Sequence, residues 1–221
     1  MPEREVEVLN LGVRGWNSDH YLEAWRRFGV ALVPDLVILE WSLHDLPGMR
    51  ELLVGVPFPE PTPSEGLFSK LSRAAVVRHF RAESRHRGRK VRWEKLRSDV
   101  NAALEDWRPE GASSLRESIA ELVGEIRATD SRPVLLCFPY EFQVRIEEAD
   151  RSPEGSLGMI CSGIDVPYYA IGPTLRQHLT ERSSIRPAVF LRGDLCHPNR
   201  TGHELISEEL FFVLESSGLL P

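Results

Sequence analysis

The chain has few cysteines and no long hydrophobic run, and each shortage excludes a class of protein. There are three cysteines, at Cys137, Cys161 and Cys196. Because their number is odd and no two form a Cys-x-x-Cys pair, neither a disulfide framework nor a zinc site is expected. No apolar run approaches the roughly 20 residues of a membrane-spanning helix. The first residues lack the basic start and apolar core of a secretory signal. The chain as given is therefore expected to be soluble, with any signal or anchor upstream of Met1 and the compartment undetermined.

Positive charge is also in short supply. The 221 residues carry 27 Lys and Arg against 33 Asp and Glu, a net charge of −6. Binding to nucleic acid requires a basic surface that neutralises phosphates, so no nucleic-acid partner is expected. The length suits one domain with one substantial core, spanning residues 1–221.

One basic segment departs from this average. A stretch rich in proline and polar residues at 57–65 leads into residues 70–97, where Lys and Arg greatly outnumber acidic residues. Apolar residues recur between 67 and 80 and predict an amphipathic helix. The segment 57–97 is therefore expected to be a helical insertion. Two interpretations stay open: a lid or a contact with an anionic membrane surface, and a plain solvated helix.

Hydrophobic patterns alternate between those of strands and those of helices. Strands are predicted at about 5–11, 36–41, 133–139 and 166–171, and the second is expected to be buried on both faces. Helices are predicted from Ser18 or Asp19 to Gly29, at 115–128 with Ser113 or Ser114 as its cap, and at 204–214. Tyr21 is expected on the apolar face of the first helix, Leu115 and Ile126 on that of the second, and Phe211 on the inward face of the third. This alternation predicts an α/β fold with a mostly parallel sheet, in which sites form beyond the carboxyl-terminal ends of the strands.

Near the C-terminus, Asp194 stands three residues before His197, directly ahead of the closing helix. A neutral imidazole can take a proton from a hydroxyl and return it to a leaving group. A carboxylate that accepts the other ring N–H fixes the tautomer and stabilises the imidazolium. The alternative is structural, with Asp194 capping a helical turn and His197 and Pro198 as its entry residues.

Two further motifs follow hydrophobic runs. Residues 10–18 read Asn-Leu-Gly-Val-Arg-Gly-Trp-Asn-Ser, and the backbone N–H of Gly15 could stabilise a developing oxyanion. Taken alone, Gly15 could equally be an ordinary turn glycine. Residues 42–45 read Ser-Leu-His-Asp, in which the His44 ring could donate one N–H or serve only the structure.

The three motifs, in this order along the chain, resemble those of the SGNH/GDSL hydrolases. The resemblance covers residues 6–221 apart from the 57–97 insertion. It implies a three-layer α/β/α fold with five parallel strands in the flavodoxin-like order 2-1-3-4-5. It also implies His197 as general base, Asp194 as its orienting carboxylate, and Gly15 as a donor to the oxyanion. No metal or organic cofactor is implied.

The chain departs from this family at two points. Where the family has Gly-x-Asn-Asp, this sequence has His44 in place of the asparagine that donates to the oxyanion. The strand that carries the family's Gly-Asp-Ser nucleophile has no counterpart, and Ser18 and Ser42 do not follow Gly-Asp. That strand would be central, between residues 6–11 and 36–41. We therefore expect an N-terminally truncated protein that is inactive as given.

The resulting functional expectation is a serine esterase or deacetylase acting on a carbohydrate or lipid acyl ester. The rival is a non-catalytic module that binds an acyl group or glycan and has lost the chemistry. A flavodoxin-like ligand domain is a third reading, although no Gly-x-Gly-x-x-Gly phosphate loop is present.

Overall fold

The computed structural model describes residues 6–13, 16, 18–45, 98, 109–145, 152–181, 189–191 and 196–220. The expected insertion at 57–97 lies outside these residues. Along the chain, the described elements are α1 (Ser18–Ala24), a π-helical turn (Trp25–Gly29), α2 (Val30–Leu32), β1 (Leu36–Ser42), a 3₁₀ turn (Leu43–Asp45), α6 (Pro109–Arg127), β2 (Arg132–Phe138), α7 (Glu141–Arg145), α8 (Ser152–Gly163), β3 (Tyr168–Ala170), α9 (Gly172–Glu181) and α10 (Arg200–Ser216).

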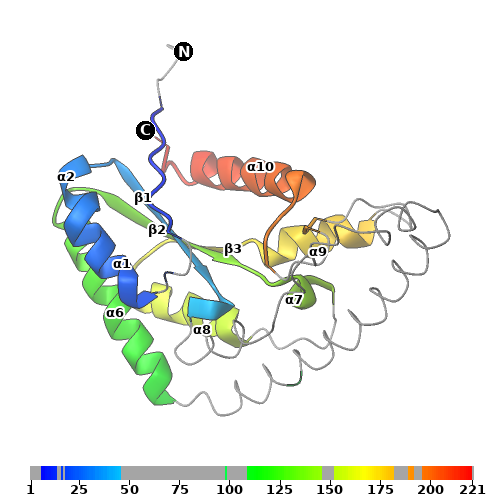
Figure 1. The fold of residues 1–221 in the computed structure, drawn as a ribbon, viewed down its shortest axis with the longest axis horizontal. Coiled ribbons are helices and arrows are strands. Elements are labelled where there is room, and N and C mark those ends of the chain that lie inside the picture. The colour runs from blue at the N-terminus through cyan, green and yellow to red at the C-terminus, as the bar shows by residue number, and fades with distance from the viewer. Residues whose placement is uncertain are drawn as a thin grey trace, which may run out of the picture.

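The described strands form a parallel sheet in the order β1-β2-β3. Leu36 is opposite Arg132 at one end of the β1–β2 pair and Ser42 is opposite Phe138 at the other. Helices cover both faces: α1, α6 and α8 lie on one side, and α10 lies on the other (Figure 1). The α/β class predicted from the alternating pattern is therefore confirmed.

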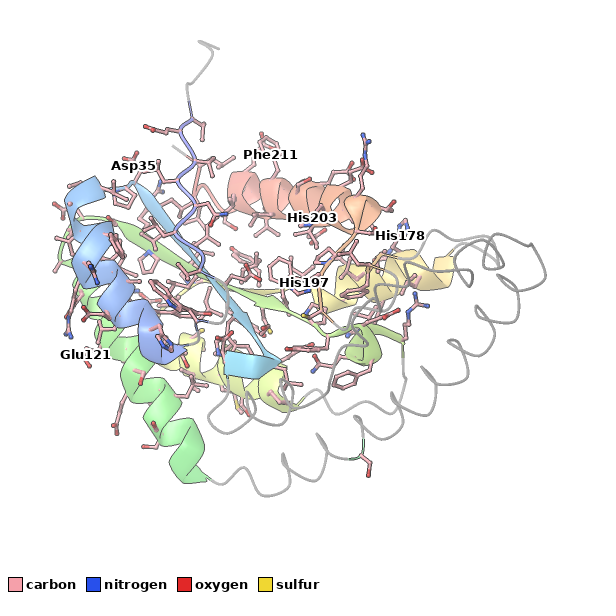
Figure 2. The ribbon with its side chains drawn as sticks, viewed as in Figure 1. Asp35, Glu121, His178, His197, His203 and Phe211 are labelled. Carbon is pink, nitrogen blue, oxygen red and sulfur yellow. The ribbon has the colours of Figure 1, made fainter. Side chains whose placement is uncertain are left out.

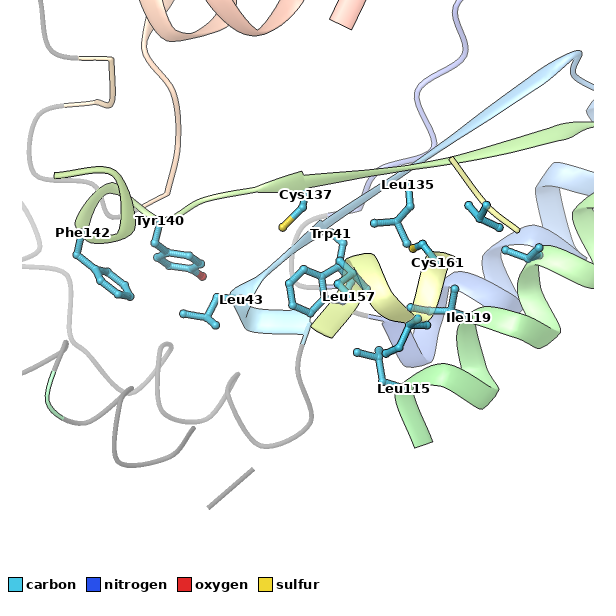
Figure 3. Packing of buried hydrophobic residues seen from close by; sticks show 13 residues of the cluster. Trp41, Leu43, Leu115, Ile119, Leu135, Cys137, Tyr140, Phe142, Leu157 and Cys161 are labelled. Atoms are coloured by element: carbon cyan, nitrogen blue, oxygen red, sulfur yellow. The ribbon is translucent and has the colours of Figure 1, made fainter. Parts of the chain in front are cut away.

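Buried side chains form a core on each face of the sheet. Leu135 and Cys137 of β2 pack into the larger core, which also holds Trp41 and Phe142 (Figure 3). Leu136, between them in sequence, packs into the second core beneath α10. This alternation follows from the two-residue period of a strand, and it explains why β2 reads as a continuous apolar run.

β1 is less buried than its sequence predicts. Ile38 is 41% exposed and Glu40 is also exposed, so the expectation of burial on both faces is wrong for this strand. The reason is its place at the edge of the described sheet, where only β2 pairs with it. Arg132 N–H donates to the Asp35 carbonyl at 3.1 Å on the β2 side. Because backbone groups alternate along a strand, those of residues 36, 38, 40 and 42 point to the outer edge.

The predicted strand at 5–11 is not formed. Residues 6–13 have neither helical nor strand structure, and Val6 and Val8 are 62% and 83% exposed. A strand needs the backbone groups of a neighbour, whereas here Gly12 N–H bonds locally to the Asn10 side chain at 2.8 Å. Alternating apolar residues alone therefore did not produce a strand in this segment.

The first helical segment continues past Gly29, where the sequence predicted its end. Helical structure runs through a π-turn to Leu32 and stops at Val33, whose φ is +44°. Gly29 has a packing role instead, because a Cβ there would lie 2.1 Å from Cε3 of the buried Trp25 ring. The missing side chain makes room for the indole.

Substituting Gly29 with alanine is expected to destabilise the protein by about 1–3 kcal/mol, since the new methyl group displaces the Trp25 ring. Gly124→Ala in α6 is the matched control. No atom lies within 4 Å of its Cβ position, so helix propensity should make it neutral or stabilising by up to about 1 kcal/mol. Urea unfolding of both variants would measure the difference, and equal effects would contradict the packing role.

Two other helices differ in detail from their predictions. α6 begins at Pro109, so Ser113 and Ser114 lie within the helix and are not its cap. Its apolar stripe is buried as predicted, including Leu115 and Ile126. On α10, Phe211 was expected to face inward but is 59% exposed and points away from the sheet (Figure 2). At about 100° per residue, it lies about 140° around the helix from the buried Ile206.

Candidate functional site

His197 lies in a loop whose backbone is fixed by antiparallel pairing. Leu191 N–H donates to the His197 carbonyl at 2.9 Å, and Asn199 N–H donates to the Val189 carbonyl at 3.0 Å. Val189 and Phe190 are buried in the core beneath α10, with exposures of 0% and 2%. The loop therefore holds the His197 backbone firmly while its side chain remains exposed.

The residues after His197 begin α10. Asn199 is the N-cap: its Oδ1 accepts from Gly202 N–H at 3.0 Å, and its Nδ2 donates to the Phe190 carbonyl at 3.2 Å. A Cβ on Gly202 would lie 2.1 Å from the Val189 carbonyl oxygen, so only glycine fits there. The cap of α10 is therefore Asn199, and Asp194 lies outside the described residues.

The His197 ring has a thiol beside it. Its Nδ1 is 3.7 Å from the Sγ of Cys196. Cys196 itself packs against the larger core, which includes Tyr140 just after the end of β2. The loop thus reaches the carboxyl-terminal end of the sheet, where Figure 2 also shows His197. In a Ser-His-Asp triad, Nδ1 is the nitrogen that donates to the carboxylate, and here this nitrogen lies beside the Cys196 thiol.

The two expected oxyanion elements are only partly described. The backbone of His44 lies in the 3₁₀ turn after β1, between Leu43 and Asp45, which are 1% and 2% exposed. The His44 side chain and Gly15 lie outside the described residues. Trp16 N–H donates a hydrogen bond to the Val13 carbonyl at 3.1 Å, so residues that precede and follow Gly15 are in contact.

Asp45 forms a polar cluster that sequence analysis missed. Its Oδ2 accepts from Ser42 N–H at 2.8 Å and its Oδ1 accepts from the Tyr21 hydroxyl at 2.9 Å. Its carbonyl accepts from the Ser18 hydroxyl at 2.9 Å. Burial, and then the nearby charge of Asp45, raises the pKa of Tyr21 far above its usual value. In the sequence, the one sign of this cluster was that Asp45 ends the Ser-Leu-His-Asp motif at residues 42–45.

Four described side chains are poorly placed to act as a nucleophile: Ser18, Ser42, Cys137 and Cys161. The Ser18 hydroxyl is engaged by the Asp45 carbonyl, and Ser42 is only 6% exposed. Burial raises the pKa of Cys137 to about 12 and that of Cys161 to about 11, so both thiols stay protonated at neutral pH.

No other type of site emerges from the described part of the chain. There, no three His, Cys, Asp or Glu side chains are grouped so as to hold a metal ion. No described helix is long and apolar enough to cross a membrane. A cavity of about 310 Å³ lies between β3 and α10, lined by apolar residues and Glu209, and no motif residue borders it.

Comparison with known proteins gives no relative: no family model, curated protein or solved structure matches the chain. The functional argument therefore depends on the motifs and their geometry.

Proposed function

We propose that this chain supplies His197, Asp194, Gly15 and His44 to an SGNH/GDSL-type serine esterase or deacetylase, whose substrate is an acyl ester of a carbohydrate or lipid. The main support is the place of β1 at the edge of the described sheet, together with His197 held at the carboxyl-terminal end of that sheet. In this proposal the nucleophilic serine arrives on a further parallel strand that pairs with β1. The observed order β1-β2-β3 would then form one side of the five-stranded sheet.

The outer edge of β1 limits how such a strand can pair. The Glu40 carbonyl lies 3.0 Å from the Tyr21 hydroxyl oxygen, whose single proton it shares with Asp45 Oδ1, and Ser42 N–H donates to Asp45 Oδ2. Leu36 and Ile38 present the outward backbone groups nearer the start of the strand. An added strand would therefore pair with the first part of β1, and its pairing would end near Glu40, where the Tyr21 hydroxyl lies. The turn that follows it would carry the serine toward the His197 loop.

The proposed chemistry is acyl transfer through a seryl ester. The serine oxygen attacks the ester carbonyl while His197 accepts the hydroxyl proton, and His197 then returns that proton to the leaving alcohol. Water, activated in the same way, hydrolyses the seryl ester to the acid and restores the serine. Asp194 orients the imidazole. Gly15 N–H, together with a His44 ring N–H, stabilises the tetrahedral oxyanion.

Labelling with a fluorophosphonate would test this function, because the reagent forms a covalent bond only with an activated serine. The protein isolated from its natural source should react at one serine outside residues 1–221, should exceed 25.1 kDa in intact mass, and should hydrolyse p-nitrophenyl esters. The 221-residue chain alone should show neither labelling nor turnover. A natural protein of 25.1 kDa that takes no label would contradict the proposal.

A non-catalytic module that binds an acyl group or glycan is the second candidate. Two observations favour it: His44 replaces the expected amide, and the Cys196 thiol lies beside His197 Nδ1. Ligand-induced NMR shifts without turnover, in natural protein of the same mass, would support this alternative.

A further inference from the structure

We infer that Asp45 is a positioning residue, which joins the turn carrying His44 to the helix that follows Gly15. The inference rests on the proposed function, in which these two residues donate to the same oxyanion. Asp45 is 2% exposed and its contacts reach both segments. It would act through its neighbours and would not touch the substrate.

On the side of the turn, the Asp45 carboxylate accepts a backbone N–H at the outer edge of β1. Ser42 N–H points to the outer edge of β1, away from β2. Asp45 Oδ2 accepts this N–H at 2.8 Å and so closes the turn around His44. Leu43, on the other side of His44, is 1% exposed. Both neighbours of His44 are therefore anchored.

On the side of the helix, two bonds hold α1. The Tyr21 hydroxyl donates to Asp45 Oδ1, and the Ser18 hydroxyl donates to the Asp45 carbonyl, both at 2.9 Å. The Tyr21 hydroxyl stays protonated because burial raises its pKa, so it remains a donor at neutral pH. The bond to a carboxylate is charge-assisted and roughly twice as strong as a neutral one.

The helix in turn holds the segment beside Gly15. The Trp16 ring stacks on His20 of α1, with ring centroids 5.9 Å apart and planes 8° apart. Trp16 N–H also bonds to the Val13 carbonyl. Displacing the first turn of α1 from Asp45 would therefore move Trp16 and the adjacent Gly15, and the same substitution would loosen the His44 turn.

Residue-resolved amide exchange in Asp45→Asn would test this coupling in the 221-residue chain. Asparagine keeps the size of the side chain but loses the charge. Exchange at Ser42 and at Trp16 should accelerate about tenfold relative to Val37, whose amide points to β2. Asp35→Asn is the matched control, because Asp35 is an exposed carboxylate at the opposite end of β1, and it should leave all three rates unchanged.

A second variant and a second measurement distinguish a positioning role of Asp45 from a general loss of stability. Tyr21→Phe removes one hydroxyl and should accelerate exchange at both sites by a smaller factor, even if Asp45→Asn folds poorly. The imidazole NMR signals of His44 should shift in both variants while Val37 stays protected. Uniform acceleration along the chain, or a change at Ser42 without one at Trp16, would overturn the inference. Neither readout needs an ester or a nucleophile, so failure of the proposed function is tested separately.

Discussion

If the proposed function holds, replacing His197 with alanine should lower kcat for ester hydrolysis roughly a thousandfold or more in the protein isolated from its natural source. In the proposed mechanism, removing the imidazole leaves no base to accept the serine proton and no acid to protonate the leaving alcohol. The loop should keep its shape, because its pairing uses the backbone of His197 and not its ring. Initial rates with p-nitrophenyl acetate, measured alongside amide protection of Leu191, would test both statements.

His203→Ala is the matched control for this substitution. His203 is also exposed, and it lies on α10 only six residues further along the chain (Figure 2). It should keep the full rate, because it has no role in the proposed triad. Equal losses in the two variants would point to a general disturbance of α10, and full activity in His197→Ala would remove His197 from the mechanism.

The parts of the fold that sequence predicted well are those with local signals. β2 is a continuous apolar run after Pro133, and α10 has a regular stripe, so both follow from the chain itself. α8 was missed because its glycines and serines break the helical pattern, although its Leu157 is fully buried. Residues 6–11 were predicted as a strand from alternation alone, but pairing depends on a neighbour that local sequence does not specify.

The same distinction holds for the candidate site. The Asp194-to-Asn199 motif is local, so it indicated His197 directly. Tyr21 was assigned only to the apolar face of a helix, because its contact with Asp45 joins residues 24 positions apart. Polar clusters assembled over such a separation have no sequence period. They become visible only when the fold brings the residues together.

Phe142→Ala should have the largest effect on stability, lowering the free energy of unfolding by about 3–5 kcal/mol. Phe142 is fully buried in α7, just beyond β2, and its ring centroid is 6.0 Å from that of Tyr140 (Figure 3). Alanine would leave a cavity in the core that supports the carboxyl-terminal end of the sheet. Denaturation with guanidinium chloride, followed by tryptophan fluorescence, would measure the change.

Phe211→Ala is the control, since it removes the same atoms from a ring that is 59% exposed. It should change stability by no more than about 0.5 kcal/mol. A domain of this kind has only about 5–15 kcal/mol in total, so losing Phe142 would remove a large share of it. Equal losses in the two variants would show that Phe211 is covered in solution. The outer face of α10, where Phe211 and Phe212 are exposed, would then be an interface with another molecule.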